Sequence, residues 1–254
     1  MTHCTICKNT NITFYCFLEP KHEIYKCKAC KNAFTFPEPD QVAYEDDDFH
    51  GQFSFSSAES LPRQWRKAIK KQVSLVQRYF SKGASILEIG CGQGLLLQEI
   101  KNKGYNTFGI EPSKQAFGIA KNKGLNVLNG YFPQVNFSED FDLIIMSQVL
   151  EHIKDPLAFL KSLSLAYKGK HLLLIQSNYK GIVPLKNKAN WYAWVPDQHY
   201  SHFSPKGLKK ITELSGIQLV TIEYSSLEYN NYWLSLISEV TPGTGDQLHC
   251  LIKL

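Results

Sequence analysis

Apolar and amphipathic stretches alternate along most of this 254-residue chain. An amphipathic helix is predicted over 61–81, because apolar side chains recur there at helical spacing. Further on, short apolar stretches predict strands, and the periodic segments between them predict helices. The strands are expected at 84–89, 106–110, 127–128, 141–146 and 172–176. Strands and helices that alternate in this way predict a parallel, doubly wound α/β sheet.

The pattern changes beyond residue 176. Residues 178–203 form an insertion rich in aromatic side chains, and the next helix is predicted to begin at Ser204-Pro205. Two more strands are predicted at 220–224 and 248–253. Because these two strands are close in sequence, we expect the last strand to be antiparallel at one edge of a mostly parallel sheet.

Four of the seven cysteines stand in two CxxC pairs, Cys4 with Cys7 and Cys27 with Cys30. Nineteen residues separate the pairs, and two short stretches among them predict a β-hairpin. Paired thiolates at this spacing favour a tetrahedral Zn²⁺ site of the ribbon type over a redox dithiol. So short a segment buries little core, so bound metal would supply most of its stability.

These patterns divide the chain into a zinc ribbon over 1–36, a linker over 37–60 and a larger domain over 61–254. The linker is rich in aromatic residues, and two of them, Phe53 and Phe55, stand among serines. Exposed aromatics beside a pocket often cover a ligand. Packing of the linker on its own domain is an equal alternative.

Composition and charge narrow the class of protein. Hydrophobic residues make up 43% of the chain and charged residues 20%, which is typical of a soluble globular protein. No apolar run approaches the roughly 20 residues of a membrane span, and the first residues lack the pattern of a signal peptide. A cytoplasmic protein is therefore expected. The net charge of +5 permits an anionic substrate without requiring nucleic acid.

A glycine-rich turn follows the first predicted strand of the larger domain. Glu88 stands inside that strand, and Gly90, Gly92 and Gly94 follow at alternate positions before the next helix. Glycines let backbone approach a ligand closely, and a helix start offers free N–H groups. An acid within the strand would repel a pyrophosphate but suits a ligand with an ammonium group. Glu111 ends the following strand, where an acid in nucleotide-binding folds binds a ribose diol.

The turn does not match the common phosphate-binding motifs, because it has neither the GxGxxG of a dinucleotide site nor the GK[ST] of a P-loop. The glycines with Glu88 and Glu111, followed by the segments 141–144 and 149–156, resemble the class I S-adenosylmethionine-dependent methyltransferases. The resemblance covers roughly residues 61–254 and implies a Rossmann-like methyltransferase sheet. An NAD-binding domain is the remaining alternative for this turn.

The resemblance implies roles in binding S-adenosylmethionine. Glu88 would lie near the methionine ammonium, the glycines would form the floor of the site, and Glu111 would bind the ribose hydroxyls. Residues after the third strand would contact adenine, and residues after the fourth would face the methionyl end. The positions concerned are Glu88, Gly90, Cys91, Gly92, Gly94, Glu111, Pro112, Asn129, Gly130, Tyr131, Ser147 and Gln148.

Three histidines are candidates for acid–base chemistry. His199 and His202 follow the fifth predicted strand, and ligands bind at the carboxyl edge of such sheets. An ordinary imidazole pKa of about 6.5 suits a proton acceptor at neutral pH. His152 belongs to a Glu-His segment that can hold a divalent metal in ubiquinone-pathway O-methyltransferases, but Gln148 stands where an acid would help. For each histidine, local packing or hydrogen bonding is the alternative.

The ribbon, the stretch 53–57 and the histidine segment together resemble the zinc-ribbon sugar methyltransferases, which act on nucleotide-linked deoxysugars. This resemblance places His199 on the proposed base. It also expects a glutamate where the chain has Gln198, a tyrosine where it has Phe53 and Phe55, and a further domain beyond Leu254. These departures favour O-methylation of a sugar or a similar small polar molecule over C-methylation of a ketosugar.

Two other functions stay open. Some ribosomal RNA methyltransferases carry an N-terminal zinc ribbon, but this ribbon is only moderately basic and arginine is scarce in the chain. A non-catalytic zinc-ribbon adaptor would not need the intact glycine turn or Glu111. The sequence thus predicts a methyltransferase with a small-molecule acceptor and leaves the acceptor, the methylated atom and the oligomeric state open.

Overall fold

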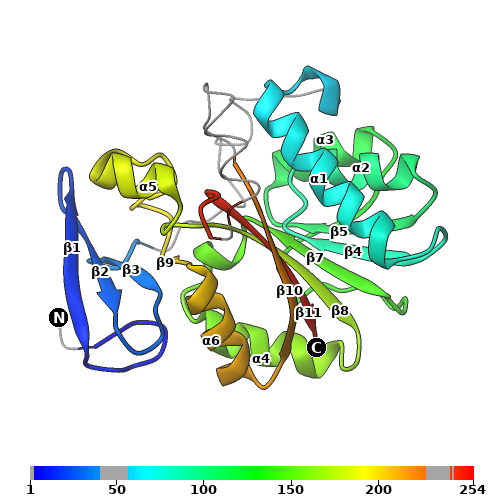
Figure 1. The fold of residues 1–254 in the computed structure, drawn as a ribbon. Coiled ribbons are helices and arrows are strands. Elements are labelled where there is room, and N and C mark those ends of the chain that lie inside the picture. The colour runs from blue at the N-terminus through cyan, green and yellow to red at the C-terminus, as the bar shows by residue number, and fades with distance from the viewer. Residues whose placement is uncertain (1–2, 41–56, 227–240, 242) are drawn as a thin grey trace. The chain divides into compact units, whose positions relative to one another are not determined.

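The computed structural model describes residues 3–40, 57–226, 241 and 243–254 (Figure 1). Phe53 and Phe55, the linker aromatics for which covering a ligand and packing on the domain are equal alternatives, lie outside these residues. Among the helices that are described, none is long and apolar enough to cross a membrane.

The chain divides into two compact units. The first unit contains Met1–Val42, Gln148–Gly169 and Leu174–Leu254. The second contains Ala43–Ser147 and Lys170–Leu173. The division into ribbon, linker and larger domain stays a prediction.

Parallel strands form the centre of the second unit. β4 (Ser85–Ile89) pairs with β5 (Asn106–Glu111) on one side and with β7 (Leu143–Ser147) on the other. β5 pairs in turn with β6 (Asn126–Asn129). Both faces of β4 and β7 are buried, which explains why their sequences are apolar apart from Glu88 and the half-buried serines Ser85 and Ser147.

Helices α1 (Arg63–Tyr79), α2 (Leu95–Asn102) and α3 (Lys114–Asn122) belong to the same unit (Figure 1). α2 packs against α1 and β5, and α3 packs against β5 and β6. A short 3₁₀ helix, η3 (Ala58–Ser60), precedes α1.

The full sheet has the strand order β10-β11-β8-β7-β4-β5-β6. In it, β8 spans His171–Ser177, β10 spans Gln218–Ser225 and β11 spans Gln247–Lys253. β10 and β11 pair antiparallel, so the predicted mostly parallel sheet with an antiparallel last strand is confirmed.

Two helices of the first unit, α4 (Pro156–Ala166) and α6 (Pro205–Ser215), pack against each other, and α6 also contacts β10. Both begin as the sequence predicts, because Asp155 and Ser204 cap them by accepting backbone N–H bonds.

The ribbon forms a second, smaller sheet with the order β1-β2-β3-β9. The predicted hairpin is present as β1 (Ile12–Leu18) and β2 (His22–Cys27). It is extended by β3 (Ala33–Phe36), and β3 pairs with β9 (Ser201–His202) from the aromatic insertion. The ribbon therefore shares its sheet with the segment that carries two of the candidate histidines.

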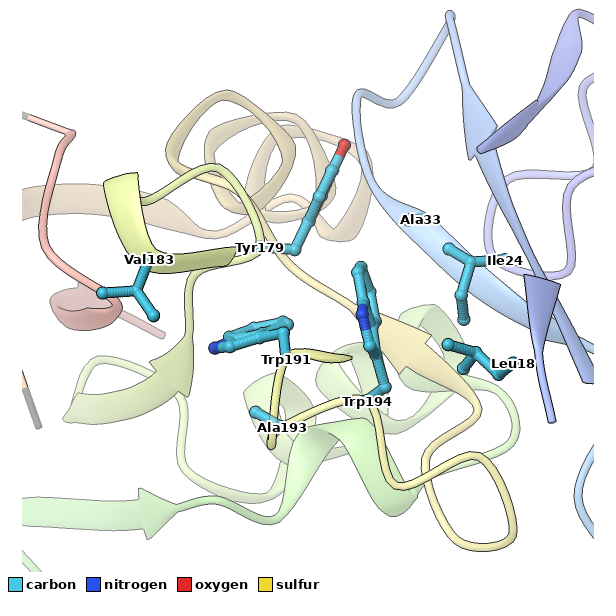
Figure 2. Packing of buried hydrophobic residues seen from close by; sticks show 8 residues of the cluster. All are labelled: Leu18, Ile24, Ala33, Tyr179, Val183, Trp191, Ala193 and Trp194. Atoms are coloured by element: carbon cyan, nitrogen blue, oxygen red, sulfur yellow. The ribbon is translucent and has the colours of Figure 1, made fainter. Parts of the chain in front are cut away.

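The insertion also shares a buried core with the ribbon (Figure 2). Within the insertion are α5 (Ile182–Asn187) and the 3₁₀ helix η5 (Lys188–Asn190). Trp194 is 2% exposed, and its ring centroid lies 4.9 Å from that of Trp191 in an edge-to-face contact. The cluster combines ribbon and insertion residues: Leu18, Ile24, Ala33, Tyr179, Val183, Trp191, Ala193 and Trp194. Tyr179, Trp191 and Trp194 of the insertion are thus core residues of the first unit, whereas Tyr192 is exposed.

Candidate functional site

The glycine turn of the second unit has a backbone conformation that favours glycine at all three positions. Gly90, Gly92 and Gly94 have φ angles of 74°, 54° and 74°, in the left-handed region that favours glycine. A methyl group added at Gly94 would lie 2.3 Å from a side-chain carbon of Leu125, so packing also requires this glycine. Around Gly92, by contrast, no described atom lies within 4 Å of such a methyl position, which leaves the backbone accessible to a ligand.

Glu111 connects the turn to the end of β5. Its carboxylate accepts one hydrogen bond from the Gly92 N–H at 2.7 Å and another from the Ser113 N–H at 2.8 Å. Its backbone carbonyl accepts bonds from the Asn129 side-chain amide at 2.9 Å and from the Gly130 N–H at 3.1 Å. One acidic residue therefore holds three predicted cofactor segments together.

Glu88 has a buried carboxyl group that is incompletely hydrogen-bonded. It is 3% exposed, and its Oε2 atom accepts no hydrogen bond within the described part of the chain. Burial, and then the negative charge of Glu111, raise the pKa of Glu88 well above its usual range. An ammonium group on a bound ligand would supply the missing positive charge, so the pair is suited to a cationic ligand.

The remaining predicted cofactor residues of this unit differ in their surroundings. Cys91 is buried against Leu97 and Val127, and burial raises the pKa of its thiol well above the ordinary value, so it lines the turn as an apolar group. The side chain of Asn129 also donates to the Pro112 carbonyl at 3.0 Å. Tyr131 is 38% exposed, and Ser147, the last residue of β7, is half-buried.

Gln148 belongs to the first unit and has an unusual backbone. Its φ of 55° lies in the left-handed region, which a non-glycine residue adopts at some energetic cost. Its backbone N–H donates to the Ile175 carbonyl at 3.0 Å, and its Oε1 atom accepts from the Ser177 hydroxyl at 2.9 Å. The buried Nε2 atom has no partner among described residues and is available to a ligand.

Glu151, His152 and His199 form a second group of polar side chains, also in the first unit. The 3₁₀ helix η4 (Leu150–His152) carries the first two, and the ring centroids of His152 and His199 lie 4.6 Å apart. Each of the three residues offers one ligand atom, and these atoms lie within 4.8 Å of one another. The group is able to bind a divalent cation or to exchange a proton with a bound hydroxyl.

Hydrogen bonding determines which atom of His199 is reactive. His199 is 8% exposed, and its Nδ1 atom lies 3.0 Å from the Ala193 carbonyl oxygen. Because a carbonyl only accepts, Nδ1 carries the hydrogen and Nε2 keeps a free lone pair. Burial, followed by the nearby His152 and His202, lowers the pKa of His199 well below its usual value, so this lone pair is available at neutral pH.

His202 has a different environment. It is 4% exposed, its ring packs edge-on against Trp194, and its Nε2 atom lies 2.9 Å from the hydroxyl of Thr35. Burial lowers the pKa of His202 to about 3, so the ring is neutral. The structure therefore brings His152 and His199 together, whereas His202 is bonded to the ribbon.

The sequence interpretation missed Glu151 and Thr35. Glu151 is 3% exposed, and burial raises the pKa of its carboxyl to about 7, an effect only partly offset by its own backbone N–H and by Gln176. Its position beside His152 was the available signal. Thr35 had none, because its contact with β9 joins residues far apart in the chain.

The four paired cysteines come together as predicted. The sulfur atoms of Cys4 and Cys30 are 3.8 Å apart, those of Cys7 and Cys27 are 3.6 Å apart, and all four lie within 4.8 Å of one another. A tetrahedron with Zn–S bonds of about 2.3 Å has sulfur–sulfur edges of about 3.8 Å, so the donor set fits Zn²⁺. A hydrogen bond from Cys30 lowers the pKa of the Cys4 thiol to about 6, which favours a thiolate.

Solved structures define the class of fold. The chain matches an S-adenosylmethionine-dependent methyltransferase from Archaeoglobus fulgidus with a TM-score of 0.55 and 20% identity, over 74% of this chain and 94% of that one. It matches the magnesium protoporphyrin IX methyltransferase of Synechocystis PCC 6803, solved with bound SAH, with a TM-score of 0.56 and 15% identity, over 75% and 83% of the two chains. The fold is that of the S-adenosylmethionine-dependent methyltransferases.

The family follows from a sequence model. The model described as "Methyltransferase domain" matches residues 50–222, and the chain belongs to this family. A ubiquinone biosynthesis O-methyltransferase of Rhodopseudomonas palustris (strain TIE-1) is 26% identical over 162 residues, which cover 59% of this chain and 63% of the relative. An uncharacterized methyltransferase of Staphylococcus carnosus is 29% identical over 167 residues, 61% and 78% of the two chains. The chain thus spans less than two thirds of the first relative.

The raised pKa of Glu151 predicts a specific pH dependence of stability. The buried carboxyl is neutral at low pH. Its favourable contribution to the free energy of unfolding is therefore lost as the pH rises from about 4.5 through about 7. When no cation is bound at Glu151, Glu151→Gln removes this loss of stability. We expect the variant to exceed the wild type in free energy of unfolding at pH 8, by up to about 3 kcal/mol, and by much less at pH 5.

Denaturant unfolding of both proteins between pH 5 and pH 8, in buffer without added divalent cations, measures this difference. Glu139→Gln provides the control, because that side chain is exposed and the same substitution should not raise the free energy of unfolding at pH 8. A stability difference for Glu151→Gln that is the same at every pH would contradict the prediction.

Proposed function

We propose that this chain transfers a methyl group from S-adenosylmethionine to a small polar acceptor, with a sugar or nucleotide-linked sugar as the best candidate. The assignment of this cofactor rests on the buried pair Glu88 and Glu111 beside an open glycine turn. Glu88 would face the methionine ammonium, and Glu111 would accept hydrogen bonds from the ribose hydroxyls. Membership of the methyltransferase domain family supports this assignment.

Residues at the ends of neighbouring strands would make the other cofactor contacts. Gly90, Cys91, Gly92 and Gly94 would form the floor of the site, and Pro112 would lie beside the ribose. Gly130 and Tyr131 would contact adenine. Ser147 and Gln148 would face the methionyl end. The Nε2 of Gln148, which has no hydrogen-bond partner among the described residues, would donate to the methionyl carboxylate.

We propose a structural Zn²⁺ ion at Cys4, Cys7, Cys27 and Cys30, whose sulfur separations fit a tetrahedral thiolate site. The thiolates would bind the metal while the buried aromatic cluster holds the ribbon against the insertion.

For the acceptor, we propose His199 as the general base. S-adenosylmethionine, when bound, supplies a methyl group on a sulfonium. The free Nε2 of His199 would accept the proton of an acceptor hydroxyl as that oxygen attacks, and the bond from Nδ1 to Ala193 would hold the ring in orientation. His152 contacts the edge of this ring and would share in binding the acceptor. His202 is kept from this role by its bond to Thr35.

A divalent cation at Glu151, His152 and His199 is a second role for the same group, favoured by the convergence of their ligand atoms within 4.8 Å. The ubiquinone biosynthesis O-methyltransferase relative makes an O-methylated small molecule a reasonable product class. Neither role requires a nucleic acid.

Cofactor binding is tested with Glu111→Gln. Both carboxylate oxygens of Glu111 accept backbone N–H groups, so the amide would present an NH₂ group to one of those donors and disturb the turn. We expect titration calorimetry to show S-adenosylmethionine bound about tenfold or more weakly by the variant. Glu139→Gln, the same change at an exposed position, should leave the affinity unchanged. Absence of binding to the unchanged protein would refute the proposed function.

The acceptor class is tested by transfer of tritiated methyl groups from S-adenosylmethionine. We expect label to enter a panel of free and nucleotide-linked sugars, because the imidazoles of His152 and His199 are able to hydrogen-bond an acceptor hydroxyl. Undermodified ribosomal RNA serves as the competing substrate. Label that enters only the RNA would replace the sugar proposal with RNA methylation, and binding without transfer to any acceptor would support an adaptor.

The base is tested with His199→Asn, which keeps a hydrogen-bonding side chain but removes the basic nitrogen. We expect turnover to fall about 10²- to 10⁴-fold while the dissociation constant for S-adenosylmethionine changes less than about twofold. His171→Asn, at the start of β8, is the matched control. Unchanged turnover would remove His199 from the mechanism, and turnover of the unchanged protein that requires added Mg²⁺ or Mn²⁺ would assign it to the metal role.

A further inference from the structure

The residues that follow the second cysteine pair hold both the insertion and the start of α6. The Lys31 carbonyl accepts hydrogen bonds from the Tyr179 hydroxyl at 2.9 Å and from the Ser204 hydroxyl at 2.7 Å. Asn32 is fully buried; its Oδ1 atom accepts from the Ser204 N–H at 3.3 Å, and its amide donates to the Gly207 carbonyl at 3.2 Å. A methyl group at Gly207 would lie 1.7 Å from that Oδ1, so the fit leaves no free space.

Three residues further on, Thr35 contacts the histidine segment directly. Its backbone N–H donates to the Tyr200 carbonyl at 3.2 Å, and the side chain is fully buried. Its Oγ1 atom lies 2.7 Å from the His199 carbonyl oxygen and 2.9 Å from Nε2 of His202. One hydroxyl thus contacts both histidines of this segment.

The single hydrogen of this hydroxyl determines which ring nitrogen of His202 carries a hydrogen. A hydroxyl has one hydrogen, and the His199 carbonyl is able only to accept, so Thr35 donates there. The lone pair of Oγ1 must then accept from His202, which places the hydrogen of the neutral ring on Nε2 and leaves Nδ1 bare. Replacing the hydroxyl would remove both constraints at once.

The opposite side of the segment is held by η4. The Tyr200 N–H donates to the Glu151 carbonyl at 2.8 Å, so residues 199–202 lie between β3 and η4. Loss of the β3 side would leave the segment bound by the η4 contact and by the bond from His199 to Ala193.

We propose that Thr35 is a positioning residue for His199 and His202, and that metal bound at the four cysteines controls the geometry of this segment through β3. The ribbon has little core of its own, so loss of the metal releases the knuckle at residues 27–31 and, with it, the pairing of Ala33 with His202. The consequence for catalysis rests on the proposed function, whereas the structural coupling does not.

Thr35→Val tests the positioning role, because valine has nearly the same shape and no hydroxyl. In the full-length chain with ¹⁵N-labelled histidine, we expect the His202 ring to change from the Nε2–H tautomer to a mixture, while the zinc content stays at one ion per chain. Thr35→Ser keeps a hydroxyl and should restore the original tautomer. A His202 spectrum that is identical in the wild type and in Thr35→Val would overturn the positioning role.

Zinc removal tests the coupling in the wild-type chain and does not depend on any variant folding. After chelation, with released zinc counted by a colorimetric reagent, we expect amide hydrogen exchange at Ser201 and His202 to accelerate at least about tenfold. Amides of β4 and β5 in the second unit should keep their protection, and S-adenosylmethionine binding should persist.

Two results would overturn the coupling: protection of β9 that is unchanged after complete zinc loss, or a chain that binds no zinc. Loss of S-adenosylmethionine binding by the metal-loaded protein would instead count against the proposed function, so the two failures are distinguishable.

Discussion

The ribbon is too short to bury a core of its own, and much of the first unit follows from this constraint. Its strands contribute Leu18, Ile24 and Ala33, and the larger side chains of the shared cluster come from the insertion. Trp194 makes the sharing specific, because its ring centroid lies 6.0 Å from that of Tyr15 in β1 and its Nε1 donates to the Lys188 carbonyl of the insertion at 2.7 Å. Bound metal and the aromatic core shared with the insertion stabilise the same small sheet in different ways. The metal constrains the cysteine knuckles, and the core buries apolar area.

Each of the two candidate sites, the glycine turn with Glu88 and the cluster of Glu151 with His152 and His199, contains a carboxyl whose ionised form is disfavoured by burial. Glu88 in the second unit and Glu151 in the first have raised pKa values mainly because they are removed from water. A folded protein keeps such groups at a cost in stability, and each is relieved by a positively charged partner. The proposed partners differ in kind: an organic ammonium suits Glu88, and a proton or a divalent cation suits Glu151 beside two imidazoles.

Local patterns determined how much of this molecule could be predicted. The parallel strands, the left-handed glycines and the two cysteine pairs depend on neighbouring residues, and the structure has them where the sequence places them. The pairing of β3 with β9 could not be predicted, because it joins Ala33 to His202 and neither strand has a distinctive sequence. For the same reason Thr35 was missed. Cofactor and catalytic roles stay predictions, as does the cytoplasmic location.

The long separations between contacting residues also bear on how the protein is made. Lys31 and Tyr179 are 148 positions apart, and Asn32 and Gly207 are 175 apart. During synthesis the ribbon leaves the ribosome before the insertion, so its aromatic partners do not yet exist. The cysteine knuckles, by contrast, are complete once Cys30 has emerged. Early metal capture would then protect four reactive thiols and an unpaired β3 edge until translation supplies the insertion that covers them.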